Sequence, residues 1–272
     1  MPAEVKIEFS VGAVGEYSVA KYDGHHIENL IDVIAEEVPV AFVYNGVSHA
    51  VMLATPQNLE DFALGFSLSE GIVDSPSDLY SVEVFHQVQG IELHLEISTA
   101  CFQRLKEKRR NLTGRTGCGL CGSESLEQAL RIPVIPSKNP VAISSDVINL
   151  AFANIRQQQQ LQTLTGATHA SAWVNLNGEI EMLREDVGRH NALDKLVGTL
   201  AKSKHTSGFI FTTSRASYEM VQKTLSAGCN ILVAISAPTG LAIRVAKQCG
   251  LTLVGFVRES SYVVYSHPEN IN

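Results

Sequence analysis

The chain has 272 residues, of which 45% are hydrophobic and 18% are charged, and its formal net charge at pH 7 is −7. This apolar content is enough for a folded core and excludes overall disorder, and the length suits one large domain or two small ones. The negative charge argues against a general affinity for nucleic acid.

The N-terminus and the cysteine content indicate the compartment. Residues 1–6 contain no basic region followed by an apolar stretch, so we expect no signal peptide. No run approaches the roughly 18 apolar residues that a membrane helix needs. Five cysteines are an odd number at low density, unlike a secreted disulfide framework. We therefore expect a cytoplasmic protein that is not inserted into a membrane.

The first third of the chain predicts two β-hairpins around one helix. The strands are expected in β-rich or alternating runs at residues 40–44, 47–53, 82–85 and 91–97. Asn45-Gly46 joins the first two runs and is a strong hairpin signal. Apolar residues recur at helical spacing in residues 59–66, and Gly71 is a suitable helix stop.

A basic, glycine-rich stretch follows at residues 103–122. It contains six arginines and lysines, four glycines and the single acid Glu107, which together predict a long exposed loop. Three prolines in residues 133–140 predict a linker beyond it. We therefore expect an N-terminal α+β region at residues 1–135, ending in this loop, and a second domain at residues 141–272.

The second domain alternates between helices and strands. Helices are expected at residues 147–155, 187–201, 218–227 and 241–248. Strands are expected at residues 169–176, 179–185, 208–213, 231–235 and 251–257. The last three strands are largely continuous apolar runs, which are typical of buried strands in an α/β sandwich.

Cys118 and Cys121 form a CxxC motif within the basic stretch. Half of a zinc site is one interpretation, although a closed site needs four ligands and no second CxxC or HxxxH is present. A redox pair is another, although that motif normally follows a strand in a βαβ unit. A nucleophilic or sulfur-carrying cysteine is the third, because nearby cations favour the thiolate and the glycines leave it accessible.

Several polar residues lie where predicted strands turn into helices. The candidate ligand-binding residues at these turns are Asp186, His190, Ser214, Arg215 and Ser236. Ligands of open α/β sheets bind at this edge, and helix N-termini favour phosphate, so we expect a nucleotide or another phosphate-bearing ligand. The alternative for each residue is a helix cap or an ion pair. After the last strand, Phe256 suits stacking on a ring and Arg258 suits phosphate.

The chain resembles the FdhD/NarQ family of formate dehydrogenase accessory sulfurtransferases. The motifs that carry the resemblance lie at residues 117–122, 184–195, 214–220, 236–239 and 250–256. The resemblance implies the α/β class, with a cytidine-deaminase-like three-layer α/β/α domain at residues 141–272 and a smaller N-terminal α+β domain. The zinc set of a deaminase, H-x-E with P-C-x-x-C, is missing from the predicted strand-to-helix turns, so we expect neither deamination nor zinc.

The resemblance also implies an activity and its residues. A sulfurtransferase of this family accepts a persulfide sulfur from a cysteine desulfurase. It transfers the sulfur to the molybdenum of a bis(molybdopterin guanine dinucleotide) cofactor, which formate dehydrogenase requires. Cys118 would carry the persulfide, with Cys121 assisting. The cofactor, or a guanine nucleotide in the same site, would contact Phe256, Val257, Arg258, Glu259, Ser260 and Ser261.

Two other functions remain open at this point. One is a chaperone that binds the molybdenum cofactor without transferring sulfur, and the other is a zinc-binding redox sensor. The oligomeric state is also open, although a homodimer would suit a cofactor with two guanine ends. The sequence does not identify the desulfurase or the formate dehydrogenase that is served.

Overall fold

The computed structural model describes residue 9 and residues 11–113 and 141–272. Both cysteines of the CxxC motif and the predicted linker lie outside these residues. None of the helices in the described part of the chain is long and apolar enough to cross a membrane.

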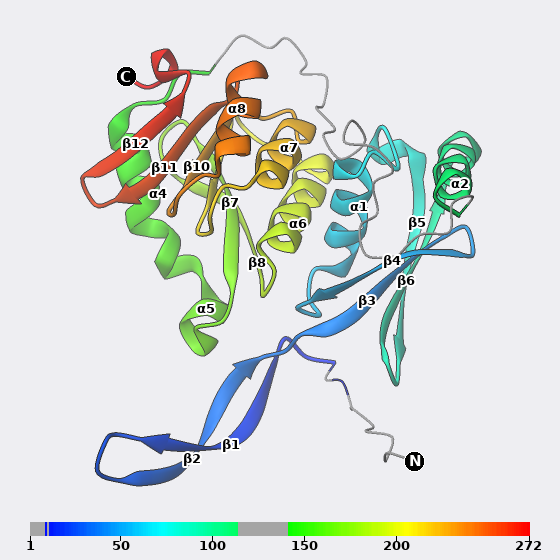
Figure 1. The fold of residues 1–272 in the computed structure, drawn as a ribbon, viewed down its shortest axis with the longest axis horizontal. Coiled ribbons are helices and arrows are strands. Elements are labelled where there is room, and N and C mark those ends of the chain that lie inside the picture. The colour runs from blue at the N-terminus through cyan, green and yellow to red at the C-terminus, as the bar shows by residue number, and fades with distance from the viewer. Residues whose placement is uncertain (1–8, 10, 114–140) are drawn as a thin grey trace.

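Two antiparallel strands, β1 (Val14–Tyr22) and β2 (Ile27–Ala35), form a ribbon that extends away from the rest of the molecule (Figure 1). The sequence analysis did not predict this ribbon. Its strands carry exposed apolar side chains, including Tyr22 and Ile31. Such strands lack the alternation between a buried and an exposed face by which a half-buried strand is recognised.

A four-stranded sheet follows, and it confirms both predicted hairpins. Its strands are β3 (Val38–Tyr44), β4 (Val47–Ala54), β5 (Leu79–Gln87) and β6 (Gly90–Ile97), in the order β4-β3-β6-β5. Asn45 and Gly46 have φ values of +46° and +79°, as a two-residue hairpin turn of this kind requires. Helix α1 (Leu59–Ser69) covers one face of the sheet, where Phe62 and Phe66 pack into its core.

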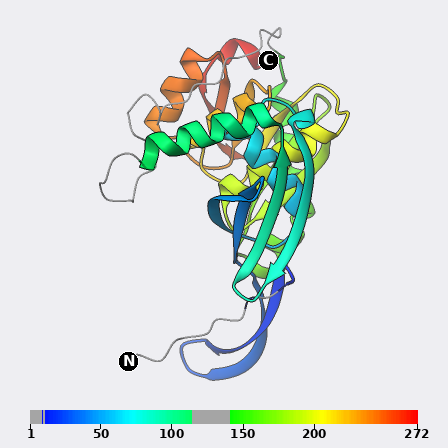
Figure 2. The ribbon, with the colours of Figure 1, turned by 90° about the vertical axis from the view of Figure 1, so that its right-hand side faces the viewer.

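The predicted loop at residues 103–122 is wrong in its first half, because helix α2 (Thr99–Thr113) occupies residues 103–113. No glycine or proline occurs in this helix, and Cys101 and Leu105, one turn apart, are buried in the core of the four-stranded sheet. The basic residues of this helix, which are arginines and lysines, are good helix formers. Figure 2 shows α2 running across one end of the sheet.

The second half of the chain forms a six-stranded sheet between two helical layers. Its strands are β7 (His169–Asn175), β8 (Ile180–Asp186), β9 (Gly208–Thr212), β10 (Ile231–Ala234), β11 (Thr252–Arg258) and β12 (Ser261–Ser266). The strand order is β12-β11-β10-β9-β7-β8, with β9, β10 and β11 parallel. Strand β12 is an antiparallel edge strand that the sequence analysis did not predict.

Helices cover both faces of this sheet, as the buried side chains show. One face packs against α6 (Arg189–Lys202), α7 (Tyr218–Ser226) and α8 (Gly240–Gln248). The other packs against α4 (Ser145–Gln158), which is followed by the short α5 (Gln160–Thr165). Two 3₁₀ turns, Pro76–Asp78 and Pro268–Asn270, complete the described elements. The predicted α/β class is confirmed, whereas the division into two domains stays a prediction.

Helices α1 and α6 join the two halves through a close crossing. A Cβ added at Gly65 would lie 1.7 Å from the Asp194 carbonyl oxygen, and one at Gly198 would lie 1.9 Å from the Asp61 carbonyl oxygen. Both glycines therefore let the two backbones touch. A buried ion pair across the neighbouring α6 and α7, between Lys223 and Asp194 at 2.9 Å, lies beside this crossing.

Candidate functional site

The carboxyl ends of the parallel strands meet at one edge of the six-stranded sheet. The Ser236 N–H donates to the Ser214 carbonyl at 3.3 Å, and the Phe256 N–H donates to the Ser236 carbonyl at 3.3 Å. The Arg258 guanidinium donates to the Ile235 carbonyl at 2.9 Å. The predicted convergence of these turns is therefore present, and their contact with a ligand stays a prediction.

The predicted cofactor-binding segment, residues 256–261, is the turn between β11 and β12. Phe256 has a φ of +54° beside an irregularity in the pairing of β11 with β12, and the residue is 44% exposed. Val257 is buried, whereas the four residues that follow it are exposed. A phenylalanine in the left-handed region with its ring in solvent is a strained arrangement, and such strain is common at ligand-binding sites.

Asp186 serves the fold at this edge. Its buried carboxylate accepts hydrogen bonds from the Thr55 and Gly188 N–H groups at 3.1 and 2.7 Å and from the Asn191 amide at 3.1 Å. It also pairs with the buried Lys195 ammonium at 2.6 Å. Burial lowers the pKa of Lys195, although this carboxylate opposes that effect. Both carboxylate oxygens of Asp186 are therefore bound by groups of the protein. This matches the alternative in which Asp186 caps the chain and forms an ion pair instead of binding a ligand.

The other residues predicted at the turns differ in their access to solvent. Ser214 is buried, and its hydroxyl donates to the Arg215 carbonyl at 3.0 Å. Arg215 is exposed, and His190 and Ser236 are half-buried. The last three are therefore the members of the predicted set that a ligand can reach.

His190 begins an ion-pair cluster at the N-terminal ends of α6 and α7. Its Nε2 lies 2.7 Å from a Glu219 carboxylate oxygen and 3.3 Å from the Ser217 hydroxyl. The hydrogen bond from His190 lowers the pKa of Glu219. Nearby, burial and the Arg189 charge lower the pKa of His169. This part of the edge therefore offers the Arg189 guanidinium near His169, whose lowered pKa favours its neutral form.

Two hollows lie on the α4–α5 side of the same edge, and Arg156 lines both. The larger has a volume of about 600 Å³ and extends to Gln159, His169 and Ile235. The smaller has a volume of about 330 Å³ and extends to Glu259 in the β11–β12 turn. The sequence analysis missed the α4–α5 residues. Their one signal is the run of four glutamines at residues 157–160.

The comparisons with known proteins decide the family. The model of the FdhD/NarQ family matches residues 35–272. The chain belongs to the FdhD/NarQ family. It is 57% identical over 242 residues to the sulfur carrier protein FdhD of Cupriavidus necator, with 88% of this chain and 84% of that protein covered. It is 52% identical over 243 residues to the protein of the same name from Bordetella petrii, with 88% and 87% covered.

A solved structure supports the fold independently. A candidate formate dehydrogenase accessory protein from Desulfotalea psychrophila superposes with a TM-score of 0.74 at 21% identity. The match covers 96% of this chain and all of that chain. At this identity the likeness concerns the fold alone, which extends over both the four-stranded and the six-stranded sheet.

The family resemblance assigns its sulfur chemistry to Cys118 and Cys121, which lie outside the described residues. Cys101, Cys229 and Cys249 are the three cysteines in the described part of the chain, and all three are free and buried. Burial raises the pKa of Cys229 to about 11, and it also raises the pKa of Cys249. A thiol with a raised pKa is a poor nucleophile at neutral pH, so Cys229 and Cys249 are suited to packing.

One group of possible metal ligands occurs in the described part of the chain. Asp74, Asp78 and Cys101 place ligand atoms within 4.8 Å of one another. The Arg104 guanidinium lies 2.7 Å from an Asp74 oxygen and 3.2 Å from the Cys101 sulfur. Arg104 already supplies the positive charge there, so the group does not favour a metal ion.

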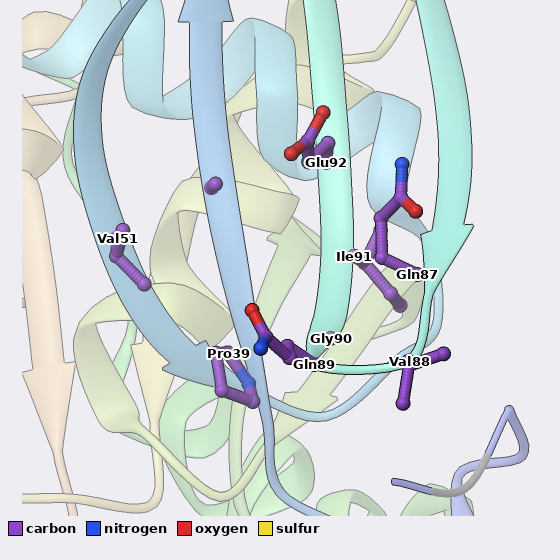
Figure 3. Close-up of a pocket in the computed structure, with 9 residues that line it drawn as sticks. Pro39, Val51, Gln87, Val88, Gln89, Gly90, Ile91 and Glu92 are labelled. Atoms are coloured by element: carbon purple, nitrogen blue, oxygen red, sulfur yellow. The ribbon is translucent and has the colours of Figure 1, made fainter.

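A third hollow lies on the outer face of the four-stranded sheet (Figure 3), opposite α1, and has a volume of about 520 Å³. Its apolar lining includes Pro39, Ala41 and Val51, and Glu92 is the charged residue of the lining. A lining whose one charged side chain is a carboxylate does not suit an anionic ligand. The hollows beside Arg156 are therefore the better candidates for a nucleotide.

Proposed function

We propose that this chain is a sulfurtransferase that acts as a sulfur carrier in the maturation of formate dehydrogenase. It accepts a sulfur atom from a cysteine desulfurase on Cys118. It then passes the sulfur to the molybdenum of the bis(molybdopterin guanine dinucleotide) cofactor, which is its substrate. The observation that carries the proposal is the 52–57% identity to proteins named sulfur carrier protein FdhD over 88% of the chain.

The loading step needs only the chemistry of thiols. The Cys118 thiolate attacks the terminal sulfur of the donor's persulfide, a new S–S bond forms at Cys118, and the donor's S–S bond breaks. The donor leaves as a thiolate, and the transferred sulfur keeps its proton. The step exchanges one S–S bond for another, so no external oxidant or reductant is needed.

The edge of the six-stranded sheet supports the second half of the proposal. Arg156, Arg189, Arg215 and Arg258 lie at or beside the carboxyl ends of β9 to β11, and a guanidinium favours phosphate. We assign the guanine nucleotide ends of the cofactor to this edge, with Phe256 to Ser261 as one border. Arg215, His190 and Ser236 are the further contacts that this assignment predicts.

Intact-mass spectrometry tests the function. The wild-type protein, Cys118→Ala and Cys121→Ala are each incubated with a cysteine desulfurase and cysteine. We expect the wild type and Cys121→Ala to gain the mass of one sulfur atom, reversibly by dithiothreitol, and Cys118→Ala to gain nothing. No gain in any of the three would overturn the sulfur-carrier function. It would favour a protein that binds the cofactor without sulfur transfer.

A further inference from the structure

The four-stranded sheet has one covered face and one open face. Phe62 and Phe66 of α1 pack into the core on the covered face. Figure 3 looks onto the other face, with α1 behind the strands, and no helix of the described residues lies over the strands there. Strands β3 and β6 pair in parallel at the centre of the sheet, and parallel strands are normally covered on both faces. The open face, which we call the outer face, is therefore a place where a second layer is expected from outside the chain.

The half of the outer face that β3 and β4 form is apolar. Pro39 pairs with Leu53 and Ala41 pairs with Val51, so these four side chains share this face. Val51 is 61% exposed and Leu53 is 55% exposed. Val88, at the tip of the β5–β6 hairpin, is 84% exposed and lines the hollow of about 520 Å³ on this face. Large apolar side chains gathered on one open face are typical of an interaction site.

The half that β5 and β6 form is acidic. Glu92 and Glu96 alternate along β6 with buried residues of the core, so both side chains lie on the outer face. Glu83 of β5 is paired with His94 between them and lies on the same face. Glu83 and Glu96 are exposed, and Glu92 lies 2.9 Å from the His94 ring nitrogen. No lysine or arginine occurs in the four strands or in their two hairpin turns, so the sheet offers these carboxylates no strong cation of its own.

We propose that the outer face is the docking site for the protein that donates sulfur, and that this donor presents apolar side chains ringed by lysines and arginines. Complementary charge selects such a surface, because carboxylates attract cations and repel other carboxylates. A second copy of this chain does not suit the face. Pairing the face with itself would bring Glu83, Glu92 and Glu96 of one copy against the same residues of the other.

The donor is chosen over the recipient by the place of this face in the fold, and the choice rests on the proposed function. The cofactor is assigned to the edge of the six-stranded sheet, so the recipient is expected at that edge, and a protein on the four-stranded sheet leaves it free. Strand β6 ends at Ile97 and α2 begins at Thr99, and α2 is followed in the sequence by Cys118. A donor on the outer face is therefore held by the half of the chain from which the Cys118 segment departs.

Two variants of exposed side chains test the docking site. Val51→Lys changes the apolar half, and the double variant Glu83→Lys/Glu96→Lys changes the acidic half. Each places cations where the donor presents its own, on edge strands that tolerate lysine. We expect each to weaken the binding of a purified cysteine desulfurase about tenfold or more in biolayer interferometry at low salt. Glu60→Lys is the matched control, because it makes the same change of charge at an exposed residue of α1, on the covered side of the sheet. It should bind like the wild type.

A loading assay separates docking from chemistry. Each protein receives sulfur either from the desulfurase with cysteine or from inorganic polysulfide, and mass spectrometry measures the persulfide on Cys118. The Cys118 thiolate attacks a terminal sulfur of the polysulfide, an S–S bond forms at Cys118, and the polysulfide leaves one sulfur shorter as its dianion. We expect both outer-face variants to load slowly from limiting desulfurase and at the wild-type rate from polysulfide, which needs no docking surface. Their circular dichroism spectra should match that of the wild type, because the changed side chains are exposed.

The outcomes distinguish this inference from the proposed function. If both outer-face variants bind the desulfurase as tightly as the wild type does, the donor docks elsewhere and the inference is overturned, while a wild type that still loads Cys118 leaves the sulfur carrier intact. Light scattering on the eluted proteins gives a second refutation. A wild-type dimer that Val51→Lys converts to monomers would show that a second copy covers the face. A wild type that loads from neither sulfur source would instead overturn the sulfur carrier.

Discussion

The crossing of α1 and α6 allows a prediction in which two physical effects have opposite signs. Replacing glycine by alanine inside a helix normally stabilises it by roughly 1 kcal/mol, because alanine has the higher helix propensity. Gly198 lies inside α6, so propensity alone predicts that Gly198→Ala stabilises the protein. The packing of the helix predicts the reverse.

The magnitude follows from the space at Gly198. The new Cβ would lie 1.9 Å from the Asp61 carbonyl oxygen, and contacts under 3.0 Å are essentially absent from proteins. The helices must therefore move apart by about 1 Å. Overpacking typically costs about 1–3 kcal/mol. The movement would also lengthen the 2.8 Å hydrogen bond from Thr199 to Asp61. We expect a net destabilisation of about 2 kcal/mol once the gain in propensity of roughly 1 kcal/mol is subtracted.

Urea unfolding followed by far-ultraviolet circular dichroism measures this difference, with Gly240→Ala as the matched control. Gly240 begins α8, and a Cβ there would meet only the flexible end of Arg244, at 3.5 Å. The control should be as stable as the wild type or slightly more so. A Gly198→Ala midpoint at or above that of the wild type would show that the helices are not in backbone contact, and the reasoning would fail.

Three further predictions concern acid stability, strain and thiol reactivity. Although burial opposes the shift, hydrogen bonds from Arg184, Thr199 and Lys202 hold the pKa of Asp61 below its usual 3.8. Its contribution to stability is therefore present above pH 3.8 and is lost as the pH falls through the folded-state pKa. Asp61→Asn should cost about 1–3 kcal/mol in urea unfolding at pH 7 and progressively less in acid; a constant difference would contradict the pKa shift. Phe256→Gly should stabilise the fold by roughly 1 kcal/mol in urea unfolding, because glycine adopts the positive φ without strain. In a calorimetric titration, the same variant should bind guanosine diphosphate more weakly than the wild type does. Unchanged binding would exclude the ring as a contact. Iodoacetamide at pH 8 should modify the buried cysteines only after denaturation, and peptide mass spectrometry on the native protein should find no label on Cys101, Cys229 and Cys249.

Local signals in the sequence predicted most of the second half of the fold and both hairpins of the four-stranded sheet. Asn45-Gly46 is such a signal, since the turn depends on the conformations of two adjacent residues. The β1–β2 ribbon has no comparable pattern, because its apolar side chains remain exposed. Helix α2 was hidden by a change of composition, since the glycines that suggested a loop begin only at Gly114, after the helix ends at Thr113.

The candidate site was predictable at its strand ends and not on its α4–α5 side. That the turns after β9, β10 and β11 would meet follows from a general property of parallel sheets. No local pattern distinguishes Gln159 from the three glutamines around it. Its burial depends on the position of α5, which Glu185 fixes through hydrogen bonds across more than twenty residues of sequence. Contacts of this kind arise only when the chain is folded.

The carboxylates at the end of β8 have a structural role in the motif at residues 184–195. The protein's own groups occupy the Asp186 carboxylate, so Asp186 acts by holding neighbouring elements in place. Asp186 binds the Thr55 N–H, and the Glu185 carbonyl accepts a hydrogen bond from the Gln57 side chain, so this strand end holds the chain that leads into α1. On the other side, the Glu185 carboxylate holds the beginning of α5 and, with it, the hollow that Gln159 lines. Glu185 and Asp186 thus position the N-terminal half and the hollow beside α4 and α5 from one point of the chain. A change at either residue should therefore lower the stability of the fold and move α5 or the chain that leads into α1, because the partners of each carboxylate come from another element.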